Sequence, residues 1–243
     1  MSVTCLNCNT VYEGKDCPEC GQKAKTERVT FSSILHDIPH SIFHVDKGVF
    51  YTLVQLLYRP GKAVKEYLAG RRVNYFLPFA YLFLLSGITA FITHQKLDYL
   101  LSQGKVATFT NSYIPYLPAA ILYNKYPALL FCTLIPLISL FSWLLNLDSK
   151  YNYWENIILN TYLIAQFNLF FAINDIIISI HYYGSLTPML VCFFCYIGFA
   201  YYQFFPGKSA FIDILKKIVL FGVIVVMVLT SLTFSGLMTR WWW

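Results

Sequence analysis

Charged residues are scarce in this sequence. Asp, Glu, Lys and Arg make up 12% of the 243 residues, whereas hydrophobic residues make up 57% and aromatic residues 19%. A soluble domain carries roughly 25% charged residues. Because so few charges cannot cover a soluble surface, the composition excludes an ordinary soluble globule. It predicts a chain most of which lies in lipid.

Familiar catalytic motifs are also missing. The sequence has no phosphate-binding loop, no Ser/His/Asp order, no zincin motif and no dinucleotide-binding fingerprint. Its first 30 residues are polar and rich in Cys, which excludes a cleaved secretory signal with an apolar core. We therefore expect the first apolar segment to stay in the protein as a membrane anchor.

The charges that are present gather near the N-terminus. Residues 1–74 hold ten of the 18 Lys and Arg and seven of the 12 Asp and Glu. The basic residues flank apolar segments, as orientation in a bilayer requires. We interpret the net charge of +6 as a sign of membrane topology and contact with anionic lipid, and do not expect nucleic-acid binding.

Five segments are long and apolar enough to be predicted as membrane-spanning helices, since a span needs about 20 mostly apolar residues. With the N-terminus inside, the cytoplasmic parts hold 14 Lys and Arg and the outer parts hold four. The sequence thus predicts an all-α integral membrane protein with about five spans, its N-terminus cytoplasmic and its C-terminus outside. The segments are Tyr75–Thr93, Tyr126–Leu147, Asn156–Ile180, Pro188–Phe205 and Ile218–Met238.

Two further stretches are not predicted to cross, and one of them, Tyr113–Tyr123, is apolar but only 11 residues long. Residues 29–74 are expected to form amphipathic helices on the cytoplasmic face, where Val49–Tyr58 is interrupted by Arg59-Pro60-Gly61 and Lys62–Ala69 ends at Gly70. Tyr113–Tyr123 lies in the loop 94–125, and we expect it to be interfacial or re-entrant. The predicted division is therefore 1–28, 29–74 and 75–243.

Four cysteines near the N-terminus have metal-ligand spacing. Cys5-x-x-Cys8 and Cys17-x-x-Cys20 are two pairs, each of which can turn a backbone knuckle that points both thiolates at one ion. Because residues 1–28 have almost no apolar core, metal binding would drive their folding. The pattern predicts a structural zinc ribbon. A redox dithiol is disfavoured because the βαβ context of such motifs is absent.

A group of histidines and acids precedes the first predicted span. On an unbroken helix His36, His40 and His44 would share one face with Asp37 close by, which is a geometry for metal ligands or a proton relay. Pro39 opposes such a helix. His36, Asp37, His40, His44 and Asp46 are candidate catalytic residues, and the alternative is an interfacial helix among lipid headgroups.

The same region carries a family resemblance. Its motifs are His36-Asp37-x-x-His40-x-x-x-His44-x-Asp46, Thr52, Arg59-Pro60-Gly61 and Tyr67-x-x-Gly70-x-Arg72-x-x-Tyr75-x-x-Pro78. They resemble an uncharacterised bacterial family, a domain of unknown function whose members join a Cys-x-x-Cys ribbon to several spans. The resemblance covers residues 5–78 and implies no activity. It implies a place in the bacterial inner membrane, and the five-span layout is similar in architecture to Yip-type proteins.

The third predicted span carries a polar stripe. At 100° per residue, Asn160, Asn168, Asn174 and Asp175 fall within a 120° arc, and Gln166 lies elsewhere. Such a stripe should face protein or water. Because an acid within a span is unfavourable, Asp175 suggests a proton or ion path. The alternative is that the amides hold helices together and that Asp175 is wetted near the interface.

These features support three hypotheses about function. The first is a scaffold whose cytoplasmic zinc ribbon and basic interfacial helices dock a protein partner at the inner membrane. The second is a transporter or channel-like subunit that uses the polar stripe. The third is an enzyme that acts on lipid with the His/Asp cluster. We favour the first, with lipid as a further partner and a homo-oligomer left open, because no nucleophile and no paired charges within the spans are recognisable.

Overall fold

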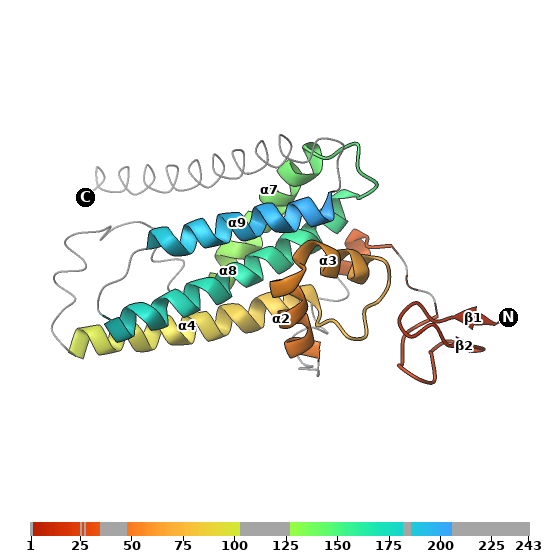
Figure 1. Ribbon diagram of the computed structural model, residues 1–243, viewed down its shortest axis with the longest axis horizontal. Coiled ribbons are helices and arrows are strands. Elements are labelled where there is room, and N and C mark those ends of the chain that lie inside the picture. Colours follow the sequence, from red (N-terminus) through yellow and green to blue (C-terminus); the bar gives the residue numbers. More distant parts are fainter. Residues whose placement is uncertain are drawn as a thin grey trace.

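The computed structural model describes residues 2–24, 26, 28–34, 48–102, 127–181 and 186–205. Within these residues the chain is mostly helical, with a small β-hairpin at its N-terminal end (Figure 1). The elements are β1 (Val3–Thr4), β2 (Val11–Tyr12), α2 (Gly48–Tyr58), α3 (Pro60–Leu68), α4 (Pro78–Ser102), α7 (Pro127–Leu144), α8 (Tyr153–His181) and α9 (Leu186–Phe204).

Helix α3 is short because specific residues define both of its ends. Pro60 occupies the first helical position, where its missing N–H is not needed. Gly70 follows the C-cap residue with a φ of +102°, a conformation that favours glycine. Its N–H donates to the Tyr67 carbonyl and the Arg71 N–H donates to the Glu66 carbonyl, which together make a Schellman motif. The helix expected to end at Gly70 does so.

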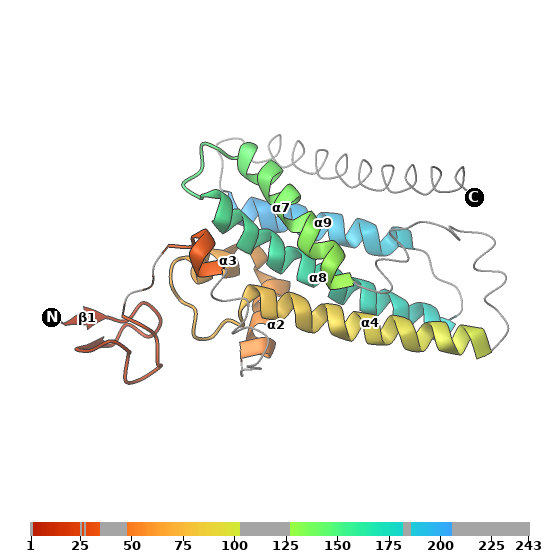
Figure 2. The ribbon, with the colours of Figure 1, turned by 180° about the vertical axis from the view of Figure 1, so that it is seen from behind.

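Helices α4, α7, α8 and α9 form a bundle in which successive helices run in opposite directions. Figures 1 and 2 show α4 and α8 leading away from the hairpin end and α7 and α9 leading back toward it. The most extensive contact joins α4 to α8, and α8 also packs against α7 and α9. The apolar core centres on α8, with Leu159, Tyr162 and Ala165 buried.

The long helix α8 begins at a capping box. The Asn152 side chain accepts a hydrogen bond from the Glu155 N–H at 2.8 Å, and the Glu155 carboxylate accepts one from the Asn152 N–H at 2.8 Å. Arg28 donates to the same carboxylate at 2.8 and 2.9 Å. One acidic side chain therefore starts the helix and ties it to the segment that follows the hairpin.

We expect Glu155→Gln to destabilise the first turn of α8 by about 0.5–1 kcal/mol, because it removes the charge that faces Arg28, whereas glutamine keeps one oxygen that can accept the Asn152 N–H. Solvent screens this ion pair, because the Arg28 side chain is 59% exposed. Hydrogen exchange at the amides of residues 153–156 is the measurement. Asp148→Asn is the control in the exposed loop before α8. Equal exchange in both variants would contradict the expectation.

The five-span prediction finds limited support. A helix is present at each of the four described segments, but α8, over Tyr153–Ile177, is the one described helix that is long and apolar enough to cross a bilayer. The apolar parts of α7 and α9, Leu134–Leu144 and Pro188–Phe204, are shorter. Membrane character thus rests on α8 in this structure, and the five-span arrangement is not supported by it. The segments Tyr113–Tyr123 and Ile218–Met238 lie outside the described residues.

The bounds of the first segment also differ from expectation. The span predicted over Tyr75–Thr93 is a helix that begins at Pro78 and continues to Ser102. Pro78 fits the first turn of a helix, so the chain before it stays extended or turned. Beyond Thr93 the residues remain good helix formers, and residues 94–102 complete α4 although a loop was expected there.

Candidate metal centre

The four N-terminal cysteines lie together in the structure. Their sulfur atoms are all within 4.8 Å of one another, and the Cys5–Cys20 and Cys8–Cys17 pairs are each 3.5 Å apart. Four thiolates at about 2.3 Å from one tetrahedral ion would be about 3.8 Å apart. Cys5 and Cys17 are buried, whereas Cys8 is exposed. The group could therefore hold a metal ion with little movement of the sulfur atoms.

Two similar turns position these sulfur atoms. In the first, Cys5 N–H donates to the Thr10 carbonyl at 2.9 Å and Asn9 adopts a φ of +63°. In the second, Cys17 N–H donates to the Gln22 carbonyl at 2.8 Å and Gly21 adopts a φ of +73°. The left-handed residue after each pair reverses the chain, as in a metal knuckle. The first turn connects β1 to β2, which pair with Val3 opposite Tyr12.

The electrostatics of the two sides of the group differ. A side-chain hydrogen bond of 3.2 Å to Thr10, assisted by the backbone of the same residue, lowers the pKa of the Cys8 thiol to about 6. Burial raises the pKa of the Cys17 thiol to about 11. A metal ion stabilises thiolates, so binding would release the protons held on the buried side. With four protein ligands the site has no open position for a substrate.

The ribbon, residues 2–24, contacts the turn that follows α3. A Cβ atom on Gly70 would lie 2.7 Å from the Leu6 side chain and 3.3 Å from Thr26, so the backbone there passes directly over the ribbon. Arg72 N–H donates to the Gln22 side chain at 3.3 Å, and the Gln22 amide donates to Thr26 at 3.0 Å. The ribbon therefore packs against the turn after α3 and does not extend freely from the rest of the protein.

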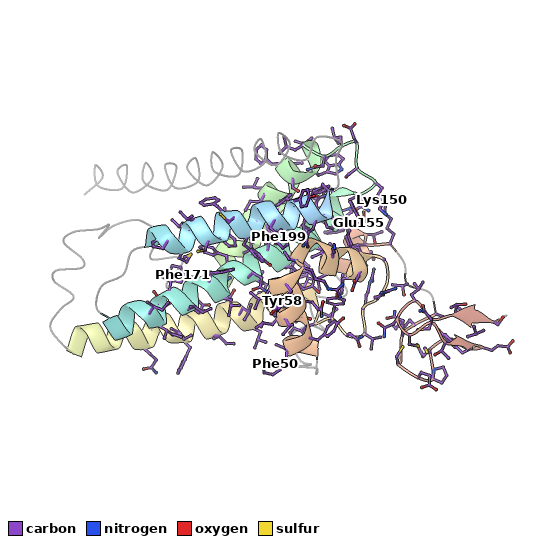
Figure 3. All side chains as sticks on the ribbon, in the orientation of Figure 1. Phe50, Tyr58, Lys150, Glu155, Phe171 and Phe199 are labelled. Atoms are coloured by element: carbon purple, nitrogen blue, oxygen red, sulfur yellow. The ribbon has the colours of Figure 1, made fainter. Side chains whose placement is uncertain are left out.

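The segment after the ribbon makes a second attachment. Arg28 binds Glu155 and also donates to the Lys150 carbonyl, and the Asn152 amide donates to the Val29 carbonyl at 3.2 Å. Figure 3 labels Lys150 and Glu155, which lie at the end of the bundle nearest the ribbon. Two attachments from different parts of the chain define how the ribbon is oriented.

Residues of the motif that resembles a known family connect α2, α3 and the start of α4. We call these three segments the platform. Arg59 donates to the Glu66 carboxylate at 2.8 and 3.3 Å, and the Tyr75 hydroxyl donates to the same carboxylate at 2.9 Å. Thr52, fully buried, accepts the Phe76 N–H at 2.7 Å. These contacts fold α2, α3 and the start of α4 into one unit, which explains the part of the motif that lies in the described residues.

Gly61 joins this platform to the bundle. A Cβ atom there would lie 2.2 Å from the Ala200 carbonyl oxygen and 2.6 Å from the Phe204 nitrogen. The N-terminus of α3 can therefore meet the C-terminal end of α9 only because residue 61 has no side chain. Their opposite dipole ends face each other, which adds to the attraction. The Tyr196 hydroxyl, also on α9, donates to the Leu56 carbonyl at 3.0 Å.

The other candidate residues fall in two places. His36, Asp37, His40, His44 and Asp46 lie outside the described residues. In the stripe on α8, Asn160, Asn168 and Asp175 are buried and Asn174 is half-buried. Gln166, which helical periodicity set apart from the stripe, is buried as well and donates to the Tyr81 hydroxyl at 3.0 Å. The α8 stripe and the ribbon are thus at separate sites.

The side chains that bond to the polar residues of α8 were not predicted from the sequence. Asn160 donates to Ser139 at 3.2 Å and accepts the Tyr201 hydroxyl at 2.7 Å, and Asn156 accepts the Ser142 hydroxyl at 2.8 Å. These side chains belong to α7 and α9. Small hydroxyl residues three or four positions apart in an apolar helix are the one feature of the sequence that pointed to them.

Comparison with known proteins gives a match to part of the chain. A family model described as a protein of unknown function, DUF3667, matches residues 46–90. No curated protein and no solved structure matches the chain significantly. The matched residues contain α2, α3 and the first half of α4, which include the Arg59 and Gly61 contacts. With the four-cysteine group, this match fits a family of unknown function that carries a zinc-ribbon-like module.

Proposed function

We propose that this protein is a membrane scaffold in which a zinc-stabilised ribbon, held in one orientation at the cytoplasmic end of a helical bundle, docks a protein partner. The observation that carries the proposal is the double attachment of the ribbon, through Gly70 and Arg72 and through Arg28. A closed four-thiolate site supplies no catalyst, but it does supply a rigid surface. Zinc is the proposed ion because all four ligands are thiolates.

We further propose that all four helices of the bundle span the membrane, as the length and composition of α8 suggest for that helix. Large apolar side chains point outward from the helices, including Ile88, Leu140, Ile173 and Phe199, and exposed apolar surface of this extent suits lipid. The alternation of α4, α7, α8 and α9 agrees with successive crossings. A fifth span over residues 218–238 and a division into 1–28, 29–74 and 75–243 complete the proposed topology.

The distribution of charge supports a cytoplasmic position for the ribbon end in a bacterial inner membrane. Arg28 and Lys150 lie at the ribbon end of the bundle, and burial together with nearby Lys150 and Lys62 lowers the pKa of Lys65. Basic residues favour the cytoplasmic side of a membrane. The neighbouring helix α2 leaves Phe50 and Tyr58 about 80% exposed, as expected of a helix that lies on lipid (Figure 3).

Protease access tests the topology. In sealed membrane vesicles, a tag at the N-terminus should be cleaved when the vesicles are inside-out and protected when they are right-side-out. A tag at the C-terminus should behave in the opposite way. Both tags cleaved in the same vesicles would contradict an odd number of spans, and recovery of the untreated protein in the soluble fraction would contradict the membrane proposal.

Partner capture tests the docking function. We expect one protein to co-purify in stoichiometric amount with the wild type from mild detergent, to be lost with Cys17→Ser, and to be reduced with Gly70→Val, which displaces Leu6 but keeps all four thiols. Gly87→Ala is the matched control, because nothing lies within 4 Å of the added Cβ. A partner that is retained by Cys17→Ser, or a partner-free wild type, would contradict the proposal.

A further inference from the structure

Helices α4 and α8 face each other with two rows of polar side chains. On α4, Ser86, Thr89 and Thr93 recur at intervals of three and four and so share one face. The Thr89 hydroxyl donates to the Asn168 carbonyl at 3.0 Å, and the Thr93 hydroxyl donates to the Asp175 carboxylate at 2.8 Å. Asn168 and Asp175, seven residues apart, share a face of α8. We call this contact the hydroxyl–amide seam.

The seam contains buried oxygen atoms without hydrogen-bond partners. Among the residues that the structure describes, the Ser86 hydroxyl and the Asn168 side-chain oxygen have none, although these residues are 1% and 0% exposed. The orientation of the Asn168 amide is defined, because its nitrogen donates to the Ile164 carbonyl at 3.1 Å. A buried polar atom without a partner is unfavourable by about 1–3 kcal/mol. The Ser86 hydroxyl and the Asn168 side-chain oxygen can therefore each bind a ligand atom.

This deficit is local. Toward the start of α8, the side chains of Asn156 and Asn160 are bonded to Ser142, Ser139 and Tyr201. The other buried atoms without partners in the described residues are the Gln166 oxygen and the Asn174 nitrogen. Gln166 bonds Tyr81 through its amide nitrogen, on the opposite flank of α8 from Asn168. The two unpartnered oxygens of the seam are thus distinct from the rest of the polar stripe.

A carboxyl group lies further along the same seam. Asp175 is 2% exposed, and at 1.5 Å per residue its position lies about 10 Å beyond that of Asn168 along α8. A carboxylate, an amide oxygen and hydroxyl groups are hard oxygen ligands, which bind hard cations. The two unpartnered oxygens are uncharged, whereas Ca²⁺ and Mg²⁺ sites in proteins include carboxylates among their ligands, so a monovalent ion fits them better.

We propose that the hydroxyl–amide seam binds a monovalent metal cation, with the Ser86 hydroxyl and the Asn168 amide oxygen as ligands and the Asp175 carboxylate as counter-charge. The cation would supply the partner that both oxygens lack. It would also stabilise the pairing of α4 and α8, the largest helix contact in the described bundle. This inference does not depend on the docking function, since it concerns residues remote from the ribbon.

Thermal unfolding of the purified full chain in detergent tests the proposal. Melting is followed by tryptophan fluorescence in NaCl, in KCl and in choline chloride at equal concentration, since choline is an organic cation that oxygen atoms do not coordinate as they do Na⁺ or K⁺. We expect a saturable rise of the melting temperature in NaCl or KCl relative to choline. Equal melting temperatures in all three salts would overturn the proposal and leave the seam as a water site.

Variants assign the effect to the seam. Asn168→Leu and Ser86→Ala should abolish or strongly weaken the cation dependence, and Asp175→Asn should weaken the apparent affinity about tenfold, because a charge roughly 10 Å away is removed. Gln166→Leu, which removes a buried amide on the other flank, should keep the dependence. Full cation dependence in Ser86→Ala, the variant least disruptive to folding, would overturn the proposal, as would its loss in Gln166→Leu alone.

Discussion

Cys17→Ser is expected to remove the bound metal from the ribbon completely and to unfold residues 2–24. The ribbon buries little apolar surface besides Cys5, Tyr12 and Cys17, so we expect its folding to depend on the proposed zinc ion. Structural zinc contributes about 10–16 kcal/mol in small peptide modules, far more than such a core can replace. Metal analysis of the purified protein should give one zinc per wild-type chain and close to none in the variant.

Cys192→Ser is the control for this prediction. Cys192 is an exposed thiol on α9 and lies outside the four-cysteine group. Its replacement should leave the metal content at one per chain. A full complement of metal in Cys17→Ser would contradict the four-thiolate site, and equal loss of metal in both variants would show that thiol replacement acts on the whole fold.

Gly61→Ala is expected to destabilise the protein by about 3 kcal/mol, because the added Cβ would overlap the backbone of α9. The Ala200 carbonyl and the Phe204 nitrogen cannot turn aside as a flexible side chain would, so α3 must move away from the bundle. Unfolding in mixed detergent micelles, followed by tryptophan fluorescence, measures the change in the free energy of unfolding.

Gly87→Ala serves as the matched substitution. Gly87 is exposed in the middle of α4 and nothing lies within 4 Å of an added Cβ. Alanine is the better helix former by about 0.5–1 kcal/mol, so this variant should be slightly more stable than the wild type. If Gly61→Ala were as stable as Gly87→Ala, the close approach of α3 and α9 would be wrong.

Local patterns were enough to predict several parts of the fold. The Cys-x-x-Cys pairs predicted that four thiols would converge, because a knuckle is defined by its own few residues. Arg59-Pro60-Gly61 and Gly70 marked the ends of α2 and α3 for the same reason. Apolar runs located the four described helices of the bundle. Their ends were less predictable, and α4 extends to Ser102 because helix formers continue past the apolar run.

Contacts between residues far apart in the chain could not be predicted from the sequence. Neither the seat of the ribbon on Gly70 nor the ion pair of Arg28 with Glu155 follows from local spacing, since both depend on how the bundle places its ends. The same holds for Asp175. Periodicity set it on a polar face of α8, but only the packing of α4 against α8 brought the Thr93 hydroxyl to its carboxylate at 2.8 Å.

The pairing of α4 with α8 has a consequence for how the protein is made. Thr89 and Asn168 are 79 residues apart, so α4 leaves the ribosome well before its main partner exists. At about 5–20 residues per second the interval is about 4–16 s. During that time the α4 hydroxyls have no amides opposite them, and α7 is synthesised between the two helices. The polar face of α4 therefore has to be satisfied by water or by other groups until α8 packs against it.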